Sequence, residues 1–155
     1  MKIELKAIKI CKWASQETLC YTANVYIDGK KAFTAENDGH GGSDNYRDYK
    51  NGTIVDKAAQ WVASQNTDED IKDWSNVTLL ELYIGDLLND HIFKKDIKRQ
   101  LKRVTVFEDG KIYQYKNEFN QALIPSLKRQ IPNGVILNTL PLDEVRKYYE
   151  KAGLA

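Results

Sequence analysis

The sequence predicts an α+β fold, and three observations lead to this prediction. Apolar and polar side chains alternate with a period of two over much of residues 2–36, which is typical of β-strands. From Thr53 onward, apolar residues mostly recur at helical spacing. Two Asp-Gly dipeptides separate alternating runs, and this dipeptide favours tight hairpin turns. We therefore expect an N-terminal antiparallel three-stranded meander packed with helices, a second short hairpin and a C-terminal helix.

Length and composition bound the number of domains. With 155 residues, of which 42% are hydrophobic, the chain is long enough to bury one ordinary core and too short for two comfortable domains. We expect a single domain over residues 1–155, in which residues 1–50 form the meander and a glycine-rich loop. Residues 51–155 are expected to be mainly helical, with a hairpin near 104–116.

The three expected strands follow one another in the first third of the chain. The run "IELKAIKI" alternates apolar and charged residues, and "TLCYTANVYI" is rich in the β-branched and aromatic residues that suit a sheet. The second run ends at Asp28-Gly29, which predicts a type I′ turn, and "KKAFTAE" returns as the third strand. If the first hairpin is centred midway between Cys11 and Cys20, these two cysteines face each other. A cross-strand disulfide is then conceivable, although a reducing cytoplasm favours two buried thiols.

Helices dominate the rest of the predicted chain. The run "TIVDKAAQWVASQ" predicts a helix with Thr53 as a candidate cap. A long helix is expected over residues 77–103, with an alternative that breaks it at Asn89-Asp90. Short alternating runs about the Asp-Gly at 109–110 predict the second hairpin. The proline in "NEFNQALIPSLKRQI" delays or kinks a third helix, "GVILN" is typical of a short buried strand, and "PLDEVRKYYEKAG" predicts the closing helix.

Charge is balanced overall and segregated along the chain. The net charge of +1 gives no global field that would draw the protein to nucleic acid or an anionic membrane. Residues 32–92, however, carry four Lys/Arg and twelve Asp/Glu, whereas residues 93–155 carry thirteen and seven. The N-terminal run lacks the apolar core of a signal peptide, and no apolar run reaches the roughly 18 residues of a membrane span. We expect a soluble, intracellular protein that contacts no membrane.

The stretch "ENDGHGGSDNY", residues 36–46, concentrates glycine, aspartate and asparagine in one loop. Glycines such as Gly41 and Gly42 adopt left-handed conformations at little cost, so the stretch can be a wide turn. Loops of this kind also carry binding residues more often than strands do. A turn and a loop that binds a macromolecular partner are therefore both open interpretations.

A third interpretation of this loop is a phosphate or metal site. Successive backbone N–H groups could face an anion, but no phosphate-binding fingerprint follows the glycines. Asp38, His40 and Asp44 have ligand types that suit a divalent metal. Because a further ligand from His91 or Asp90 is only nominal, we expect no metal and no cofactor.

The segment "FKKDIKRQLKRV", residues 93–104, predicts an amphipathic basic helix. Six cations cover about half of its circumference, and the apolar residues gather on the other side. Such a face can neutralise phosphates or meet an acidic protein surface, or it can simply be solvated. Asp96 is the sole acid within the segment, so repulsion between the cations favours a partner. The cations form two columns, Lys94, Lys98 and Lys102, and Lys95, Arg99 and Arg103.

Aromatic residues beside cations give a further signal. Tyr46 precedes Arg47 after the glycines, and Tyr113 and Tyr115 alternate on the second hairpin. Tyrosine and arginine are enriched in interface hot spots, although a strand tyrosine is more often half-buried packing. The three tryptophans are expected in the core or at its edge. The candidate binding residues are Asn37, Asp38, His40, Tyr46, Arg47, Lys94, Lys95, Lys98, Arg99, Lys102 and Arg103.

Catalytic patterns are weak in this sequence. No Ser-His-Asp elbow, HExxH or CxxC pattern occurs. Cys20 and His40 could in principle act as nucleophile and base, but a cysteine within "TLCYTA" is typical of a sheet residue. The sequence therefore favours a protein without enzymatic activity.

A strand, the "DGK" turn at residues 28–30, a return strand and the "NDGHGG" stretch at residues 37–42 follow one another in this chain. Over residues 18–43 this order resembles the N-terminal part of small uncharacterised proteins carried by bacteriophages and other mobile elements. Some proteins of this type are anti-defence proteins, including inhibitors of CRISPR nucleases. The resemblance implies a non-enzymatic binding protein that inhibits or modulates a host nucleoprotein. The alternative is a nucleic-acid-binding or metal-dependent nucleic-acid-processing factor that uses the "NDGHGG" loop. The residues that carry the resemblance are Asp28, Gly29, Lys30, Asn37, Asp38, Gly39, Gly41 and Gly42.

Overall fold

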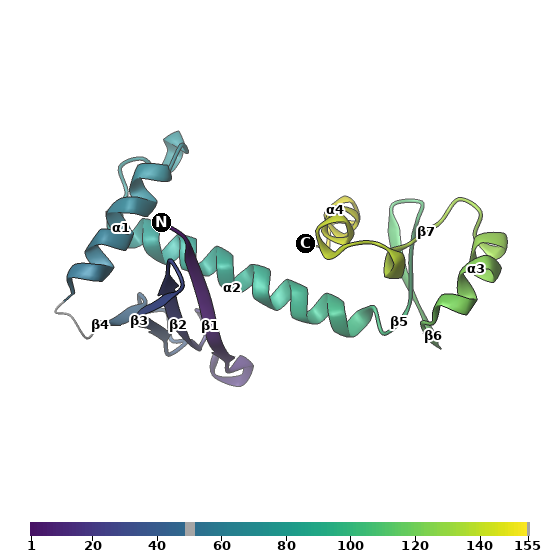
Figure 1. Ribbon diagram of the computed structural model, residues 1–155, viewed down its shortest axis with the longest axis horizontal. Helices are drawn as coiled ribbons and strands as arrows, with labels where there is room; N and C mark the ends of the chain where they lie inside the picture. The colour runs from purple at the N-terminus through teal and green to yellow at the C-terminus, as the bar shows by residue number, and fades with distance from the viewer. Residues whose placement is uncertain (49–51, 155) are drawn as a thin grey trace. The chain divides into compact units, whose positions relative to one another are not determined.

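The computed structural model describes residues 1–48 and 52–154 and has the expected α+β class (Figure 1). Its contacts divide the chain into two compact units, Met1–Asn89 and Asp90–Ala155, which we call the first and the second unit. The expectation that the chain forms a single domain stays a prediction.

The first unit contains an antiparallel sheet whose strands lie side by side in chain order. Positive φ angles of 49° at Asp28 and 80° at Gly29 mark the turn between its second and third strands, as the Asp-Gly dipeptide predicted. The strands are β1 (Ile3–Ile10), β2 (Tyr21–Ile27), β3 (Lys30–Asn37) and β4 (Asn45–Asp48).

The fourth strand corrects the prediction of a three-stranded meander. β4 lies within the stretch expected to be an irregular loop, and it pairs with β3 from Phe33 to Glu36. Tyr46 points inward, where its ring packs edge-on against Phe33 with 5.6 Å between ring centroids. Arg47 and Asn45 lie on the opposite face. A run of four alternating residues beside glycines is too short to stand out in the sequence.

Helices α1 (Thr53–Gln65) and α2 (Asn76–Gln100) supply the apolar residues that cover the sheet of the first unit. Trp61 of α1 packs edge-on against Tyr83 of α2, at the edge of this core as expected. Trp13 and Trp74 contradict the same expectation, because they are 88% and 47% exposed. The fully or largely buried residues are Ile3, Tyr21, Ala23, Val25, Phe33, Ala35, Val55, Ala58, Ala59, Val62, Leu79, Leu80, Ile84 and Leu88.

The start of α1 also differs from the prediction. The N-cap residue is Gly52, in a left-handed conformation, and Thr53 is already the first helical residue. The carboxylate of Asp48 accepts a hydrogen bond from the Ile54 N–H at 3.1 Å. An acid that reaches the first turn satisfies a free N–H group and suits the positive end of the helix dipole.

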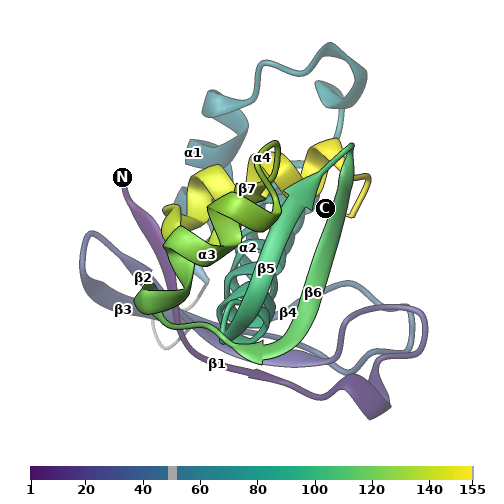
Figure 2. The same cartoon turned by 90° about the vertical axis from the view of Figure 1, so that its right-hand side faces the viewer.

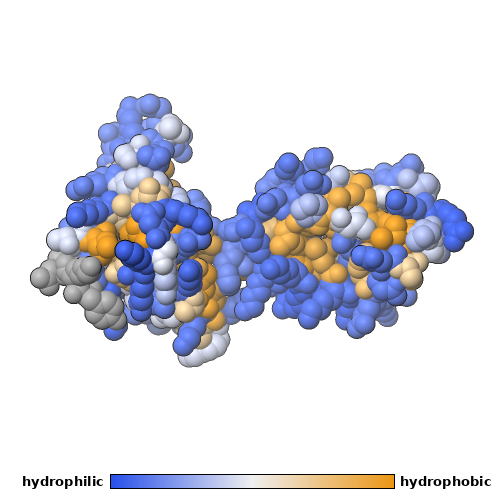
Figure 3. Space-filling view, viewed as in Figure 1, coloured by the Kyte–Doolittle hydropathy of each residue, from blue (hydrophilic) through white to orange (hydrophobic). Residues whose placement is uncertain are grey.

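The second unit combines the end of α2 with a three-stranded antiparallel sheet and two helices (Figure 2). Its strands are β5 (Arg103–Glu108), β6 (Lys111–Glu118) and β7 (Val135–Ile136), in the order β6-β5-β7, and its helices are α3 (Ile124–Gln130) and α4 (Leu142–Lys151). The face of this unit seen in Figure 3 has hydrophobic residues at its centre and hydrophilic residues around them. The predicted hairpin, short strand and closing helix are confirmed. The core cluster on the side of α2 and α4 is Ile97, Leu137, Val145 and Tyr149.

α2 is continuous through Asn89-Asp90, so the alternative with a break is wrong. The helix nevertheless ends at Gln100, three residues before the predicted end. Asn138 explains this end, because its side-chain amide donates to the carbonyl oxygens of Leu101 at 2.8 Å and Arg103 at 2.7 Å. Its side-chain oxygen accepts from the Thr105 N–H at 2.8 Å. These bonds satisfy backbone groups that a longer helix would have paired internally.

Candidate functional site

Two loops pack against each other at one end of the first sheet. The first is the β1–β2 connection, residues 11–20, and the second is the loop 38–44 between β3 and β4. The Gly39 carbonyl accepts hydrogen bonds from the N–H groups of Gln16, Glu17 and Thr18 at 3.0, 3.1 and 3.4 Å. We call this pair of loops the loop end.

Asn37 organises the loop end from inside. Its side-chain oxygen accepts from the Thr18 hydroxyl at 2.7 Å and from the Gly39 N–H at 2.9 Å. Its amide donates to the Gly42 carbonyl at 2.9 Å and to the Asp44 carboxylate at 3.1 Å. Asn37 was predicted as a binding residue, but it is only 8% exposed and all four bonds hold the loop. The structure places it as a positioning residue beneath the surface.

The glycines of the loop serve two different needs. Gly39 and Gly41 have φ angles of 88° and 89°, which favour glycine. Gly39 also lies so close to Ala14 and Cys20 that a Cβ atom would overlap the Ala14 carbonyl oxygen. Gly42 has no positive φ, and a Cβ atom at this position would have no neighbour within 4 Å. The turn interpretation therefore accounts for Gly39 and Gly41, and leaves Gly42 without a structural requirement.

The N–H groups that could have faced a phosphate are already used. Gly39 donates to Asn37, the His40 N–H donates to the Asp38 carboxylate at 3.1 Å, and the Gly41 N–H donates to the Thr18 hydroxyl at 3.2 Å. A nest binds an anion with free N–H groups that converge on it. Three successive donors that bond to the protein's own side chains leave no such nest, so the phosphate interpretation has no support in this geometry.

The candidate metal ligands of the loop separate in the structure. Asp38 and His40 are exposed, with 3.5 Å between a carboxylate oxygen of Asp38 and Nδ1 of His40. Asp44 instead accepts hydrogen bonds from Tyr21 and Asn37. Among residues 1–48 and 52–154, no three His, Cys, Asp or Glu side chains come together in a way that could hold a metal ion.

A half-buried cluster of two tyrosines and two carboxylates lies beneath the loop. The Tyr21 hydroxyl donates to the Asp44 carboxylate, and the Asp44 N–H donates to the Glu81 carboxylate of α2 at 3.3 Å. The Tyr46 hydroxyl is buried and makes no hydrogen bond of acceptable geometry to the described residues, although Asp44 is near. Burial, and then the charge of Asp44, raises the pKa of Glu81. Burial first, and then Asp44, also raises the pKa of Tyr21 and of Tyr46.

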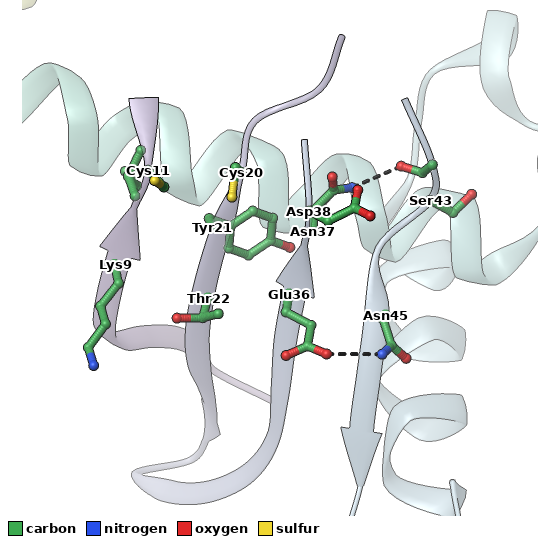
Figure 4. A pocket seen from close by; sticks show the side chains of 12 residues that line it. Lys9, Cys11, Cys20, Tyr21, Thr22, Glu36, Asn37, Asp38, Ser43 and Asn45 are labelled. Carbon is green, nitrogen blue, oxygen red and sulfur yellow. Dashed lines mark hydrogen bonds between the residues drawn. The ribbon is translucent and has the colours of Figure 1, made fainter. Parts of the chain in front are cut away.

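An open pocket of about 520 Å³ lies beside the loop end, on the face of the sheet opposite the helices (Figure 4). One residue from each strand crosses its floor in register: Lys9 is opposite Thr22, Thr22 is opposite Glu36, and Glu36 is opposite Asn45. A second row at the strand ends also lines the pocket. This second row consists of Cys11, Cys20, Asp38 and Ser43.

Arg47 and Tyr46 lie on different faces of the sheet. The Arg47 side chain is exposed and pairs with Glu36, at 2.6 Å from Nη2 and 2.9 Å from Nε. Tyr46 is directed into the core, so only Arg47 of this predicted pair is available to a partner. Burial, and then the nearby Cys11, raise the pKa of the Cys20 thiol, so a smaller fraction of it is thiolate at neutral pH. His40 bonds with Asp38, so the nucleophile–base pair considered from the sequence is not assembled.

The basic residues of the second unit fall into two groups. Lys94 pairs with Asp90 at 2.9 Å, and Arg99 lies 3.3 Å from Asp96. The others are exposed and form no ion pair with the described residues, 1–48 and 52–154; we call them the basic corner. The prediction that the six cations form two columns on one helix is therefore wrong, because α2 ends at Gln100, before Lys102 and Arg103. The basic corner consists of Lys95, Lys98, Lys102 and Arg103.

Sequence reasoning missed the residues that shape these sites. Thr18, Glu81 and Asn138 were not singled out, and each acts through hydrogen bonds to residues far away in the chain. For Asn138, its place directly after the apolar run "VIL" was an available signal, since a polar residue there needs partners.

Comparisons with known proteins add no family: no family model, no curated protein and no solved structure matches this chain. Across the described ranges, no helix has the length and apolar character that a membrane crossing needs.

Proposed function

We propose that the protein is a non-enzymatic binding protein that modulates a host nucleoprotein, with the basic corner and strand β6 as its main contact surface. The observation that carries this proposal is the set of four exposed cations that lack an acidic partner in the described chain. Asp90 and Asp96 already pair with Lys94 and Arg99. Glu118 is opposite Arg103 in the register of β5 and β6, but the two described side chains form no ion pair. Two of the four, Lys95 and Lys98, are three positions apart on α2, and neighbouring like charges on a helix repel by a few tenths of a kcal/mol per pair. Phosphates or carboxylates of a partner would replace that repulsion with attraction.

β6 extends this surface beyond the helix. The Gln114 side chain donates to the carbonyl of Gln100 at 2.9 Å, and the Phe119 N–H donates to the carbonyl of Lys102 at 2.9 Å. Gln114 of β6 is thus tied to the last residue of α2, and Phe119, just after β6, to Lys102 of the basic corner. Tyr113 and Tyr115 are 43% and 42% exposed on the same strand. Tyrosines next to cations are favourable groups for a protein interface.

β6 also has an open edge. It is the outer strand of its sheet, and seven of its eight residues are exposed. The outward N–H and C=O groups of an edge strand can pair with an extended segment of another protein. An acidic extended segment would match both the backbone edge and the cations beside it.

The biological setting rests on the resemblance over residues 18–43. It supports a protein carried by a phage or another mobile element, acting in the bacterial cytoplasm as an anti-defence inhibitor, with a CRISPR nuclease as the most specific target. In this proposal the first unit offers a second contact through Asp38, His40 and Arg47, which are exposed near the loop end.

Nucleic-acid binding is the second candidate function, because the basic corner could neutralise backbone phosphates without a protein partner. A metal-dependent processing role has less support, since the loop carboxylate of Asp44 is taken up by Tyr21 and Asn37.

A charge-reversal experiment tests the main proposal. The variant K98E/K102E should lose partner capture from a bacterial lysate that has been treated with nuclease. Affinity for the captured protein should fall at least about tenfold, with a weaker dependence on salt. The matched control K128E/R129E makes the same charge change at exposed positions of α3 and should bind like the wild type.

Each result separates the two candidates. Capture that survives nuclease and depends on the basic corner supports the protein-binding proposal. Capture lost on nuclease treatment, together with a shift of duplex DNA at low salt, supports nucleic-acid binding instead. Equal capture by both charge-reversal variants and the wild type contradicts the role of the basic corner.

A further inference from the structure

We propose that Cys11 and Cys20 are a redox modification site, at which an intramolecular disulfide forms reversibly across the β1–β2 connection. The pair lies in the first unit, apart from the basic corner and β6, and its formation does not depend on the proposed function. Figure 4 shows the two cysteines on neighbouring strand ends beside the pocket. Both are free thiols in this structure and both are half-buried.

Strand register brings the two cysteines together. Lys9 is opposite Thr22 and Ile10 is opposite Tyr21, so the next pair along the ladder is Cys11 and Cys20. The Cys11 N–H donates to the Cys20 carbonyl at 2.9 Å, which supports that pairing just beyond the end of the ladder. Opposite residues that exchange both backbone hydrogen bonds have Cα atoms about 5.5 Å apart, within the range of about 4.4–6.8 Å that disulfides span. Here one of the two bonds joins the cysteines and the Ser15 hydroxyl replaces the other, so the proposal requires the two Cα atoms to lie within this range.

A serine hydroxyl holds this arrangement in the reduced form. Ser15 Oγ donates to the Cys11 carbonyl at 2.9 Å and accepts from the Cys20 N–H at 2.9 Å. The hydroxyl thus takes the place of the second ladder bond and fixes both backbones. In the proposal, the two thiols meet by side-chain rotation on these fixed backbones.

Thiol–disulfide exchange is the chemistry that suits these groups. The thiols line an open pocket, and the proposal takes oxidised glutathione as the small disulfide that reaches them there. One cysteine thiolate attacks a glutathione sulfur and forms a mixed disulfide, and one glutathione leaves. The second cysteine thiolate then attacks the cysteine sulfur of that mixed disulfide, and the second glutathione leaves. The two cysteines lose two electrons and two protons, and oxidised glutathione becomes two reduced molecules.

The bond would act on the loop end. It would close a ring over residues 11–20, and the N–H groups of Gln16 to Thr18 within this ring hold the Gly39 carbonyl. A Cβ atom on Gly39 would be only 2.9 Å from the Cys20 Cβ, so the loop rests directly on this cysteine. Oxidation should therefore make local opening of the loop rarer.

Intact-mass measurement of the full chain in oxidised glutathione tests the site. The wild type should lose about 2 Da, the mass of two hydrogens, and regain it with a reductant. Amide exchange at residues 16–18 should slow at least about threefold on oxidation. C11S and C20S should each retain one bound glutathione instead, because the second thiolate is missing.

Two outcomes would overturn the proposal. One is a wild type that keeps two bound glutathiones without losing the 2 Da mass, and the other is a disulfide between two copies of the chain. Should a serine variant fail to fold, wild-type protein alkylated at the cysteines before oxidation replaces it as the control. A disulfide without slower exchange at residues 16–18 would leave the pairing but contradict its action on the loop.

Discussion

The side-chain amide of Asn37 donates a hydrogen bond to the main-chain carbonyl of Gly42 at 2.9 Å and thereby closes the loop 38–44 from inside. The same side chain receives the Gly39 N–H on its oxygen. One side-chain amide therefore holds the loop both at Gly39 and at Gly42. A loop held in this way keeps its shape before any partner arrives, which lowers the entropy cost of binding.

Removing this amide should destabilise the first unit. We expect Asn37→Ala to lower the free energy of unfolding by about 2–3 kcal/mol, because several buried donors and acceptors lose their partner together. Urea unfolding followed by tryptophan fluorescence is a suitable measurement, since all three tryptophans are in the first unit. Asn45→Ala is the matched control, as the Asn45 amide makes an exposed bond to Glu36. A loss of equal size in the two variants would contradict the central role of Asn37.

The two kinds of glycine in the loop should respond differently to a methyl group. Gly39→Ala should destabilise by more than about 2 kcal/mol, because it adds a left-handed alanine and a contact with the Ala14 carbonyl. Gly42→Ala should change stability by less than about 0.5 kcal/mol, since the added carbon meets no neighbour within 4 Å. Thermal unfolding of both variants checks this order. A reversed order would show that the loop has another conformation in solution.

Local patterns in the sequence predicted most of the fold, and long-range bonds account for the errors. Alternation, Asp-Gly turns and helical spacing act over a few residues, so the strands, hairpins and helices were mostly found. The end of α2 depends instead on Asn138, which is 38 residues beyond Gln100 along the chain. β4 likewise depends on its pairing with β3. Neither partner can be identified from a single sequence.

The candidate site was predicted less well than the fold. The glycine loop and the basic segment were found because their composition is unusual. Which side chains face outward was not predictable, because that depends on the register of β4 and on the end of α2. For this reason Asn37 and Tyr46 were grouped with Asp38 and Arg47, although the structure directs the first two inward.

Glu81 should make the stability of the first unit depend on pH. Burial and Asp44 raise its folded-state pKa above the unfolded value of about 4.3. The folded state therefore binds the proton more tightly, and the wild type loses stability as pH rises from the unfolded pKa through the folded one.

Glu81→Gln cannot titrate and keeps an oxygen that can accept the Asp44 N–H. Relative to the wild type, it should be more stable at pH 7.5 than at pH 4, as measured by urea unfolding at both values. Glu81→Ala should share this changed pH dependence while losing the bond to Asp44. A difference between Glu81→Gln and the wild type that is the same at both pH values would show that Glu81 is not the titrating group.

Asn138 should be the corresponding key residue of the second unit. Its side chain bonds to Leu101, Arg103 and Thr105 at 2.7–2.8 Å, so Asn138→Ala leaves two carbonyls and one N–H without these partners. We expect a loss of about 2–3 kcal/mol in the second unit.

Tryptophan fluorescence does not report on this unit, because no tryptophan lies within residues 90–155. Amide exchange in β5 measures the effect directly, and the Thr105 amide should exchange about 30-fold faster in Asn138→Ala at a loss of about 2 kcal/mol. Asn117→Ala, at an exposed position of β6, is the matched control and should exchange like the wild type. Because Lys102 and Arg103 of the basic corner follow the end of α2, Asn138→Ala should also weaken partner binding, although Asn138 carries no charge. Unchanged exchange at Thr105 would show that the end of α2 is set by the helix itself and not by this asparagine.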